Sequence, residues 1–241
     1  MTMLFEGLFD RKYSLEKSGV LHGMQDCHTH LLYGVDDGIA TLEDSLAVLD
    51  FLYTLGVKDV WCTPHIMEDV PNTTEFLKHR FDELHASYDG DVRIHLAAEY
   101  MLDNLFRERL MSGDLLLNGD MLLVEASAIT PPYNMTGMLQ DVLKAGFRPV
   151  LAHPERYRYM GEKEYEALHN MGVYFQMNLP SVIGFYGDTA CSKARWLLEK
   201  GMYQKVGSDC HRYNILRQQY SAPKVNAKLL KHLEKLIQSG N

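Results

Sequence analysis

Short apolar and β-branched runs recur along the chain, and most are followed by a segment whose apolar residues have helical spacing. These predicted strands are the seven runs at about 24–27, 58–63, 92–98, 121–125, 149–152, 173–177 and 204–207. Strands and helices alternating in this way are typical of parallel strands joined by crossover helices. The candidate architectures are therefore an open sheet and a closed barrel.

The first predicted helix shows how the sequence marks its ends. Thr41 is a suitable N-cap with Asp44 three residues later, and Gly56 follows the last apolar position. Its apolar face consists of Leu42, Leu46, Leu49 and Leu52. Glycines also stop three later helical segments, at Gly146, Gly172 and Gly201. Each stop is followed by another predicted strand, which strengthens the repeating βα pattern.

Histidines and acidic residues stand at or just after the ends of six of these runs. They are His28, His30, Asp37, His65, Glu99, Glu125, His153, Asp209 and His211. In an open sheet a ligand site gathers at one switch point, whereas closure into a barrel brings all strand ends to one rim. We therefore expect an α/β fold, a distorted seven-stranded (β/α)7 TIM-like barrel.

The residue types at these strand ends are those of a metal site. Imidazole nitrogens and carboxylate oxygens suit manganese, zinc or iron. Each motif alone is weak, because an HxH pair is often two ordinary strand histidines and a Glu that closes a strand is often a solvated rim residue. Five of the eleven histidines nevertheless fall where strands should end. We predict a metallohydrolase with two or three divalent ions, which these donors leave open as manganese, zinc or iron.

The charge of the chain argues against one class of partner. The formal net charge is −8 and the isoelectric point is near 5.7. A broad nucleic-acid footprint requires an excess of basic residues, so we expect no nucleic-acid partner.

Cysteine usage and hydropathy predict the compartment. The four cysteines lack the paired spacing of a zinc ribbon or a dithiol redox motif, which favours a reducing compartment over a disulfide framework. No apolar run approaches the roughly 20 residues of a transmembrane helix, and the N-terminus lacks a signal-peptide layout. We expect a soluble, cytoplasmic protein.

The length of 241 residues suits one large domain. We assign residues 21–241 to the barrel and residues 1–20 to an N-terminal extension. The extension should form a short amphipathic helix, because apolar residues cluster near its start: Met3, Leu4, Phe5, Leu8 and Phe9. Packing on the barrel is a better expectation for it than docking on a membrane surface.

The order of the motifs resembles that of the polymerase-and-histidinol-phosphatase (PHP) superfamily. The motifs are HTHLLYGVDDG, TPH, AAE, LVE, AHPERY and GSDCHR, which run from about Asp26 to Arg217. GVDDG and AHPER make the chain most similar to the bacterial manganese-dependent tyrosine phosphatases of capsule and exopolysaccharide synthesis. The resemblance implies the PHP form of the barrel.

The resemblance also implies residue roles. The nine residues at the strand ends would bind a trinuclear site, with Glu99 or Glu125 as a bridge between ions. Arg156, three residues after His153, would hold the substrate phosphate, a role that Arg217 would share. Arg212 is the alternative to Arg217, because the segment after His211 is one residue longer here than the family pattern.

The function implied is hydrolysis of protein phosphotyrosine, on the tyrosine-rich tail of a bacterial tyrosine kinase that controls capsular or exopolysaccharide synthesis. Peripheral association with the membrane would come through this kinase. A small-molecule phosphoesterase, such as a histidinol-phosphate phosphatase, is the alternative enzyme, and a non-catalytic barrel that binds phosphoproteins is the alternative outside enzymes. A thiol mechanism is disfavoured, because none of the four cysteines begins a Cys-x5-Arg loop.

Overall fold

The computed structural model describes residues 11–240. The apolar cluster that predicts an N-terminal helix, Met3 to Phe9, lies outside these residues. The described part of the extension contains strand β1 (Lys12–Tyr13) and the short helix α2 (Leu15–Ser18). β1 pairs antiparallel with β11 (Val225–Asn226), which attaches this segment to the C-terminal part of the chain.

The central strands are parallel and lie close to the predicted runs. They are β2 (Gln25–Thr29), β3 (Asp59–Cys62), β4 (His65–Ile66), β5 (Arg93–Leu96), β6 (Glu99–Met101), β7 (Met121–Glu125), β8 (Arg148–Ala152), β9 (Tyr174–Asn178) and β10 (Lys205–Gly207). Six of them pair in the order β10-β9-β8-β7-β6-β4, and three in the order β2-β3-β5. Two of the predicted strands, at 58–63 and 92–98, correspond to β3 and β5, and each is followed after a two-residue break by a further short strand, β4 or β6, that was not predicted. Pro64, which lacks an N–H, lies in the break between β3 and β4.

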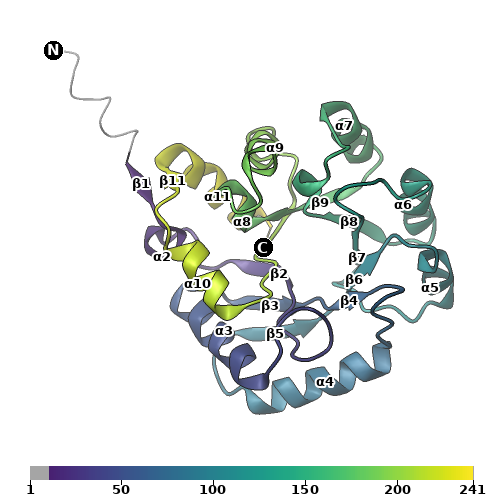
Figure 1. The fold of residues 1–241 in the computed structure, drawn as a ribbon, viewed down its shortest axis with the longest axis horizontal. Helices are drawn as coiled ribbons and strands as arrows, with labels where there is room; N and C mark the ends of the chain where they lie inside the picture. Colours follow the sequence, from purple (N-terminus) through teal and green to yellow (C-terminus); the bar gives the residue numbers. More distant parts are fainter. Residues whose placement is uncertain (1–10, 241) are drawn as a thin grey trace.

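Backbone hydrogen bonds connect the two groups of strands, so that together they curl around one axis. The N–H of Asp209, just after β10, donates to the carbonyl of His28 on β2 at 2.9 Å, and the N–H of His30 donates to the carbonyl of Cys210 at 3.1 Å. These bonds place the first strand beside the last. The structure thus confirms an α/β fold with a curled parallel sheet (Figure 1).

Helices surround the sheet on its outer side (Figure 1). They are α3 (Leu42–Thr54), α4 (Thr74–Ser87), α5 (Phe106–Ser112), α6 (Met135–Lys144), α7 (Glu162–Asn170), α8 (Leu179–Val182), α9 (Asp188–Glu199), α10 (Tyr213–Ser221) and α11 (Ala227–Ser239), with the 3-10 turn η1 (Pro154–Arg156) after β8. Within residues 11–240, no helix is long and apolar enough to cross a membrane.

The predicted helix ends are confirmed. Thr41 Oγ1 accepts a hydrogen bond from the N–H of Asp44 at 3.2 Å at the start of α3. Gly146, Gly172 and Gly201 adopt φ of +88°, +97° and +68° after α6, α7 and α9. These left-handed conformations cost glycine little, so each helix can end sharply and turn into the next strand.

Apolar packing and polar groups occupy different parts of the fold. The main core lies between the sheet and the helices and includes fully buried Val48, Val60 and Leu122. A small apolar cluster, Leu123, Val150 and Ala152, is separate from it. Buried imidazoles and carboxylates gather instead at the C-terminal ends of the strands, where His28, His30 and Glu99 are 0% exposed. This rim carries the candidate site.

Candidate metal centre

The structure brings all nine predicted ligand residues together. We call this set, His28, His30, Asp37, His65, Glu99, Glu125, His153, Asp209 and His211, the nine-residue centre. Its members fall into four overlapping groups in which the ligand atoms lie within 4.8 Å of one another. The groups are His30–Asp37–His65–His211, His28–His30–Asp209, His28–Glu99–His153 and His65–Glu99–Glu125. Residues from β2, β4, β6 and β7, and from the loops after β2, β8 and β10, thus face one volume.

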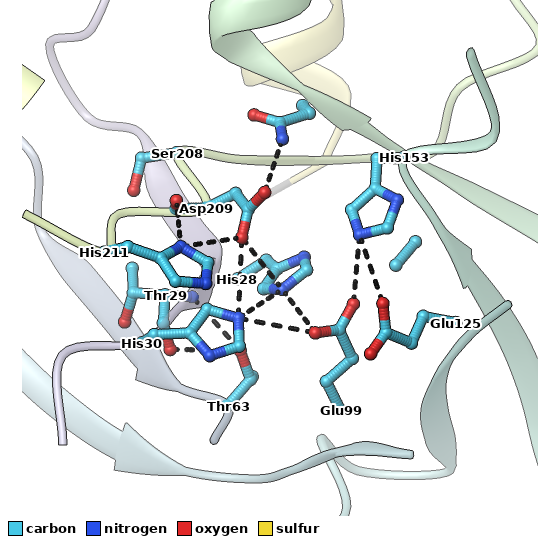
Figure 2. Close-up of polar contacts among 12 residues, drawn as sticks. His28, Thr29, His30, Thr63, Glu99, Glu125, His153, Ser208, Asp209 and His211 are labelled. Carbon is cyan, nitrogen blue, oxygen red and sulfur yellow. Dashed lines mark hydrogen bonds and ion pairs between the residues drawn. The ribbon is translucent and has the colours of Figure 1, made fainter. Parts of the chain in front are cut away.

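Glu99 lies in the middle of the centre. Its Oε2 is 3.2 Å from Nε2 of His28, 3.3 Å from Nε2 of His30 and 3.2 Å from Nδ1 of His65. Its Oε1 is 3.1 Å from Nε2 of His153. Figure 2 shows the Glu99 carboxylate between the His28–His30 pair and His153. Two oxygens that face different imidazoles are suited to joining two ions.

Two further acids close the centre on either side of Glu99. Asp209 Oδ1 lies 3.6 Å from Nε2 of His28 and 3.4 Å from Nε2 of His30. Glu125 Oε1 lies 3.0 Å from Nδ1 of His65. Each group therefore combines imidazole and carboxylate donors.

Asp37 completes the most exposed group. Its Oδ1 is 3.5 Å from Nε2 of His65 and 3.5 Å from Nε2 of His211, and its side chain is 71% exposed. The loop after β2 brings it there. Asp37 is therefore the member of the centre that is most open to solvent and to a substrate.

Several atoms of the centre lack hydrogen bonds of good geometry. Glu99 Oε2, Glu125 Oε1, His65 Nδ1 and His153 Nδ1 are buried, and none of them has a partner in hydrogen-bonding geometry among the described residues, although the first three lie within 3.3 Å of another member of the centre. Leaving buried polar atoms unsatisfied costs about 1–3 kcal/mol each, so native proteins rarely do so without a reason. Divalent ions coordinated by these donors would satisfy most of these atoms, and five imidazoles with four carboxylates fit manganese, iron or zinc.

Electrostatics point in the same direction. Burial alone lowers the pKa of His28, but the charges of Glu99 and Asp209 outweigh it and raise the pKa to about 9. The same balance raises the pKa of His30 and of His65. Burial opposes ionisation of Asp209, yet the surrounding histidines, His28 first, lower its pKa to about 2. Without a metal, protons on the imidazoles thus offset the negative charge of the carboxylates. Binding of a cation would displace these protons.

Two of the nine residues have backbone conformations that are unusual for L-residues. His153 has φ of 34° and Asp209 has φ of 52°. Left-handed conformations outside glycine are uncommon, and they persist where the surrounding structure enforces them, frequently at functional sites. At both positions this turn follows directly on the end of a strand.

Residues that the sequence analysis did not single out hold the histidine rings. Gln176 Oε1 on β9 lies 2.8 Å from Nδ1 of His28, and Asp36 Oδ2 lies 2.8 Å from Nδ1 of His30. Such partners leave the other ring nitrogen free for a metal. Asp36 stands beside Asp37 in GVDDG, so the motif contained a signal for it. Gln176 had none, because it is one polar residue inside a strand.

His95 lies four residues before Glu99, a spacing that in a regular strand would put both side chains on one face, but it is not in the centre. Its Nε2 lies 2.9 Å from Asp59 Oδ1, and its ring stacks on Trp61 at 4.6 Å between centroids. It is thus a hydrogen-bonded structural histidine.

The three candidate phosphate-binding arginines have different surroundings. Nη1 of Arg156 donates to Asp209 Oδ2 at 3.0 Å, and its guanidinium lies 4.5 Å from the ring centroid of Tyr186. Arg156 and Arg212 line one cavity beside the centre. Arg217 instead lies over the rings of Phe51 and Tyr213, at 5.9 and 5.8 Å. The structure therefore places Arg156 and Arg212, and not Arg217, next to Asp209 and His211.

Comparison with known proteins places this geometry in a family. Residues 24–237 match the family model described as capsular polysaccharide synthesis, CpsB/CapC. The tyrosine-protein phosphatase CpsB of Streptococcus agalactiae is 31% identical over 211 residues, which cover 80% of this chain and 84% of that protein. CpsB of Streptococcus pneumoniae is 28% identical and is covered over 98% of its length, against 89% of this chain.

Solved structures agree with the fold. The crystal structures of YwqE from Bacillus subtilis and CpsB from Streptococcus pneumoniae, described as unique metal-dependent tyrosine phosphatases, match with a TM-score of 0.71 and 22% identity over 90% of this chain and 96% of that chain. The phosphotriesterase homology protein of Escherichia coli matches with a TM-score of 0.52 and 12% identity, over 89% of this chain and 92% of that chain. These similarities extend over nearly the whole chain.

Proposed function

The chain belongs to the CpsB/CapC capsular polysaccharide synthesis family and is a tyrosine-protein phosphatase, and we propose that its nine-residue centre is where phosphotyrosine is hydrolysed. In this proposal the centre holds two or three divalent ions, manganese first. Such ions, when bound, supply Lewis acids for the phosphoryl oxygens and lower the pKa of an attacking water.

The observation that carries the proposal is the position of Glu99. One fully buried carboxylate oxygen of Glu99 lies within 3.3 Å of ring nitrogens from His28, His30 and His65, and none of the three is in good hydrogen-bonding geometry with it. A structural carboxylate would instead be expected to complete its hydrogen bonds. This arrangement supports a role for Glu99 as the bridge between ions.

The protein's own residues then have separate tasks. Gln176 and Asp36 fix the rings of His28 and His30 through their Nδ1 atoms. Arg156 offers a planar set of N–H donors to the phosphoryl oxygens, whose negative charge must be stabilised in the transition state. A phenolate leaving group has a pKa of about 10 and departs without much help from a general acid.

We further propose the biological setting. The substrate is the tyrosine-rich tail of a bacterial tyrosine kinase that controls capsular or exopolysaccharide synthesis, and the protein works in the cytoplasm without a nucleic-acid partner. Membership of a capsular polysaccharide synthesis family supports this setting. Three cysteines buried as free thiols are consistent with a reducing compartment.

The finer description of the fold is also a proposal. If β3 with β4 and β5 with β6 are two interrupted strands, the chain forms a distorted seven-stranded barrel of the PHP type. The parallel pairs β3–β5 and β4–β6 support this reading, as do the backbone hydrogen bonds between His28 and Asp209.

A direct test compares a phosphotyrosine peptide with histidinol phosphate as substrates for the manganese-loaded protein. We expect the peptide to have the higher kcat/KM, chelator to abolish turnover and added manganese to restore it. Preference for histidinol phosphate would transfer the protein to the small-molecule phosphoesterases. Metal analysis that finds no bound ion, with no turnover of either substrate, would instead indicate a phosphoprotein-binding barrel.

A further inference from the structure

A cavity of about 230 Å³ opens beside the nine-residue centre and joins two chemically different ends. One end is formed by Asp209 and His211 of the centre, with Arg156 and Arg212 next to them. The other end is apolar and includes Phe185 and Ile215, with Leu216 also in the lining. The volume is below the roughly 300–1,000 Å³ of pockets for drug-sized ligands, so it suits one side chain.

The apolar walls come from two separate elements. Phe185 lies in the loop before α9 and is 50% exposed, and Ile215 lies on the first turn of α10 and is 37% exposed. Single exposed apolar residues are common on protein surfaces. These two line the same cavity as the charged end, which distinguishes them from scattered surface residues.

The loop that carries Phe185 is fixed by its backbone. The N–H of Phe185 donates to the carbonyl of Pro180 at 3.2 Å, and the N–H of Gly187 donates to that of Gly184 at 3.2 Å. Gly184 and Gly187 have φ of +84° and +89°, conformations that a residue with a Cβ adopts only with strain. The ring of Phe185 is therefore presented by an ordered turn.

Tyr186 connects this turn to the charged end. Its hydroxyl lies 3.3 Å from Asp209 Oδ2, and its ring lies under the guanidinium of Arg156. The rings of Phe185 and Tyr186 meet edge to face at 5.0 Å between centroids. The position of the apolar wall is thus set relative to Asp209 and Arg156.

We infer that Phe185 and Ile215 form the binding site for the phenyl ring of phosphotyrosine, whose phosphate reaches Arg156 and the nine-residue centre. The inference rests on the proposed function and names the residues that select an aromatic monoester. An aromatic ring covers the exposed faces of both side chains and gains the additional attraction of aromatic pairs. A phosphorylated serine has no ring to place against these walls.

The experiment measures binding of two phosphonates that are not hydrolysed, phenylphosphonate and methylphosphonate, to the manganese-loaded protein by calorimetry. Both present the same charged group, so the ratio of their Kd values reports the ring site alone. We expect phenylphosphonate to bind more tightly than methylphosphonate. Phe185→Ala should reduce the ratio of the Kd of methylphosphonate to the Kd of phenylphosphonate by about tenfold. Ile215→Ala should reduce it in the same direction, and Phe185→Trp should keep most of it.

Phe76→Ala is the matched control, because Phe76 is 41% exposed on α4, away from the cavity. Its ratio should equal that of the unmodified protein. An unchanged ratio in both Phe185→Ala and Ile215→Ala, or an equal fall in Phe76→Ala, would overturn the inference. Turnover of the phosphotyrosine peptide is measured separately. A protein that binds phenylphosphonate selectively and does not turn over the peptide would contradict the proposed function and leave the ring site supported.

Discussion

Asp36 hydrogen-bonds the ring of His30, with Oδ2 at 2.8 Å from Nδ1. The same carboxylate oxygen accepts the N–H of His65 at 3.0 Å, and Oδ1 accepts the N–H of Gly38 at 2.9 Å. One buried acid thus positions two members of the nine-residue centre and the loop that carries Asp37. Burial opposes its ionisation, but the hydrogen bond from His30 lowers the pKa of Asp36 overall.

Replacing Asp36 with Asn should weaken manganese binding about 10- to 100-fold, the usual cost of removing a partner of a liganding histidine. The amide keeps the shape but cannot supply two negatively charged acceptor oxygens. The affinity is measured by calorimetry on the metal-free protein, with Asp50→Asn on the exposed side of α3 as control. An affinity equal to that of the control would mean that Asp36 only shapes the loop.

Glu99 and Glu125 should differ in how many ions depend on them. Glu99 lies next to four imidazoles of the centre, whereas Glu125 lies next to His65 and, at 3.9 Å, His153. Glu99→Gln should therefore reduce the metal content more than Glu125→Gln and lower turnover by about 10²-fold or more. Metal analysis and circular dichroism of both variants check this. Equal metal content in the two would argue against a bridge at Glu99.

The position of the centre was predictable because it depends on local sequence. Each ligand follows a short apolar run, and parallel strands place their C-terminal ends on one rim. The partners of the ligands depend on tertiary contacts that local spacing does not encode. Gln176 reaches His28 across 148 positions of sequence, and His95 turns to Asp59 although its spacing from Glu99 suggested the rim.

Asp26 should make stability depend on pH. It is fully buried, and burial raises its pKa to about 6, against about 3.9 in an unfolded chain. Because the pKa of Asp26 is higher in the folded than in the unfolded protein, its contribution to the free energy of unfolding is complete below about pH 4 and is lost as the pH rises to about 6. The amide of the Asp26→Asn variant does not ionise. The free energy of unfolding of this variant, relative to that of the unmodified protein, should therefore increase over that pH range by at most about 3 kcal/mol.

Thermal unfolding at pH 4 and pH 7 in the presence of chelator measures the effect of Asp26. The difference in Tm between Asp26→Asn and the unmodified protein should grow by several degrees between the two conditions. Asp69→Asn, at an exposed loop position, should show no such growth. A difference in Tm between Asp26→Asn and the unmodified protein that stays constant with pH would show that Asp26 binds protons equally in the folded and unfolded states.

Arg156→Ala should separate phosphate recognition from metal binding. The guanidinium of Arg156 makes one hydrogen bond to the described residues, to Asp209, and a guanidinium has five N–H donors. The others are available to a phosphate, so turnover of a phosphotyrosine peptide should fall by about 10² or more while metal content stays near normal. Arg156→Lys should recover only part, because an ammonium lacks the planar fork. Loss of metal together with rate would mean that Arg156 acts by holding Asp209.

Arg212 and Arg217 are compared in the same assay. Nη1 of Arg212 donates to the carbonyls of Asp37, Gly38 and His211 at 2.6–2.8 Å, so its guanidinium joins two loops of the centre beside the cavity. Arg217, at the sequence position first assigned to phosphate binding, is exposed and lies over Phe51 and Tyr213. Arg212→Ala should therefore lower kcat/KM by about 10²-fold, the low end for lost charge-stabilising groups, and Arg217→Ala should change it little. The opposite order would mean that Arg217 leaves its aromatic neighbours when the substrate binds, and would return the phosphate-binding role to it.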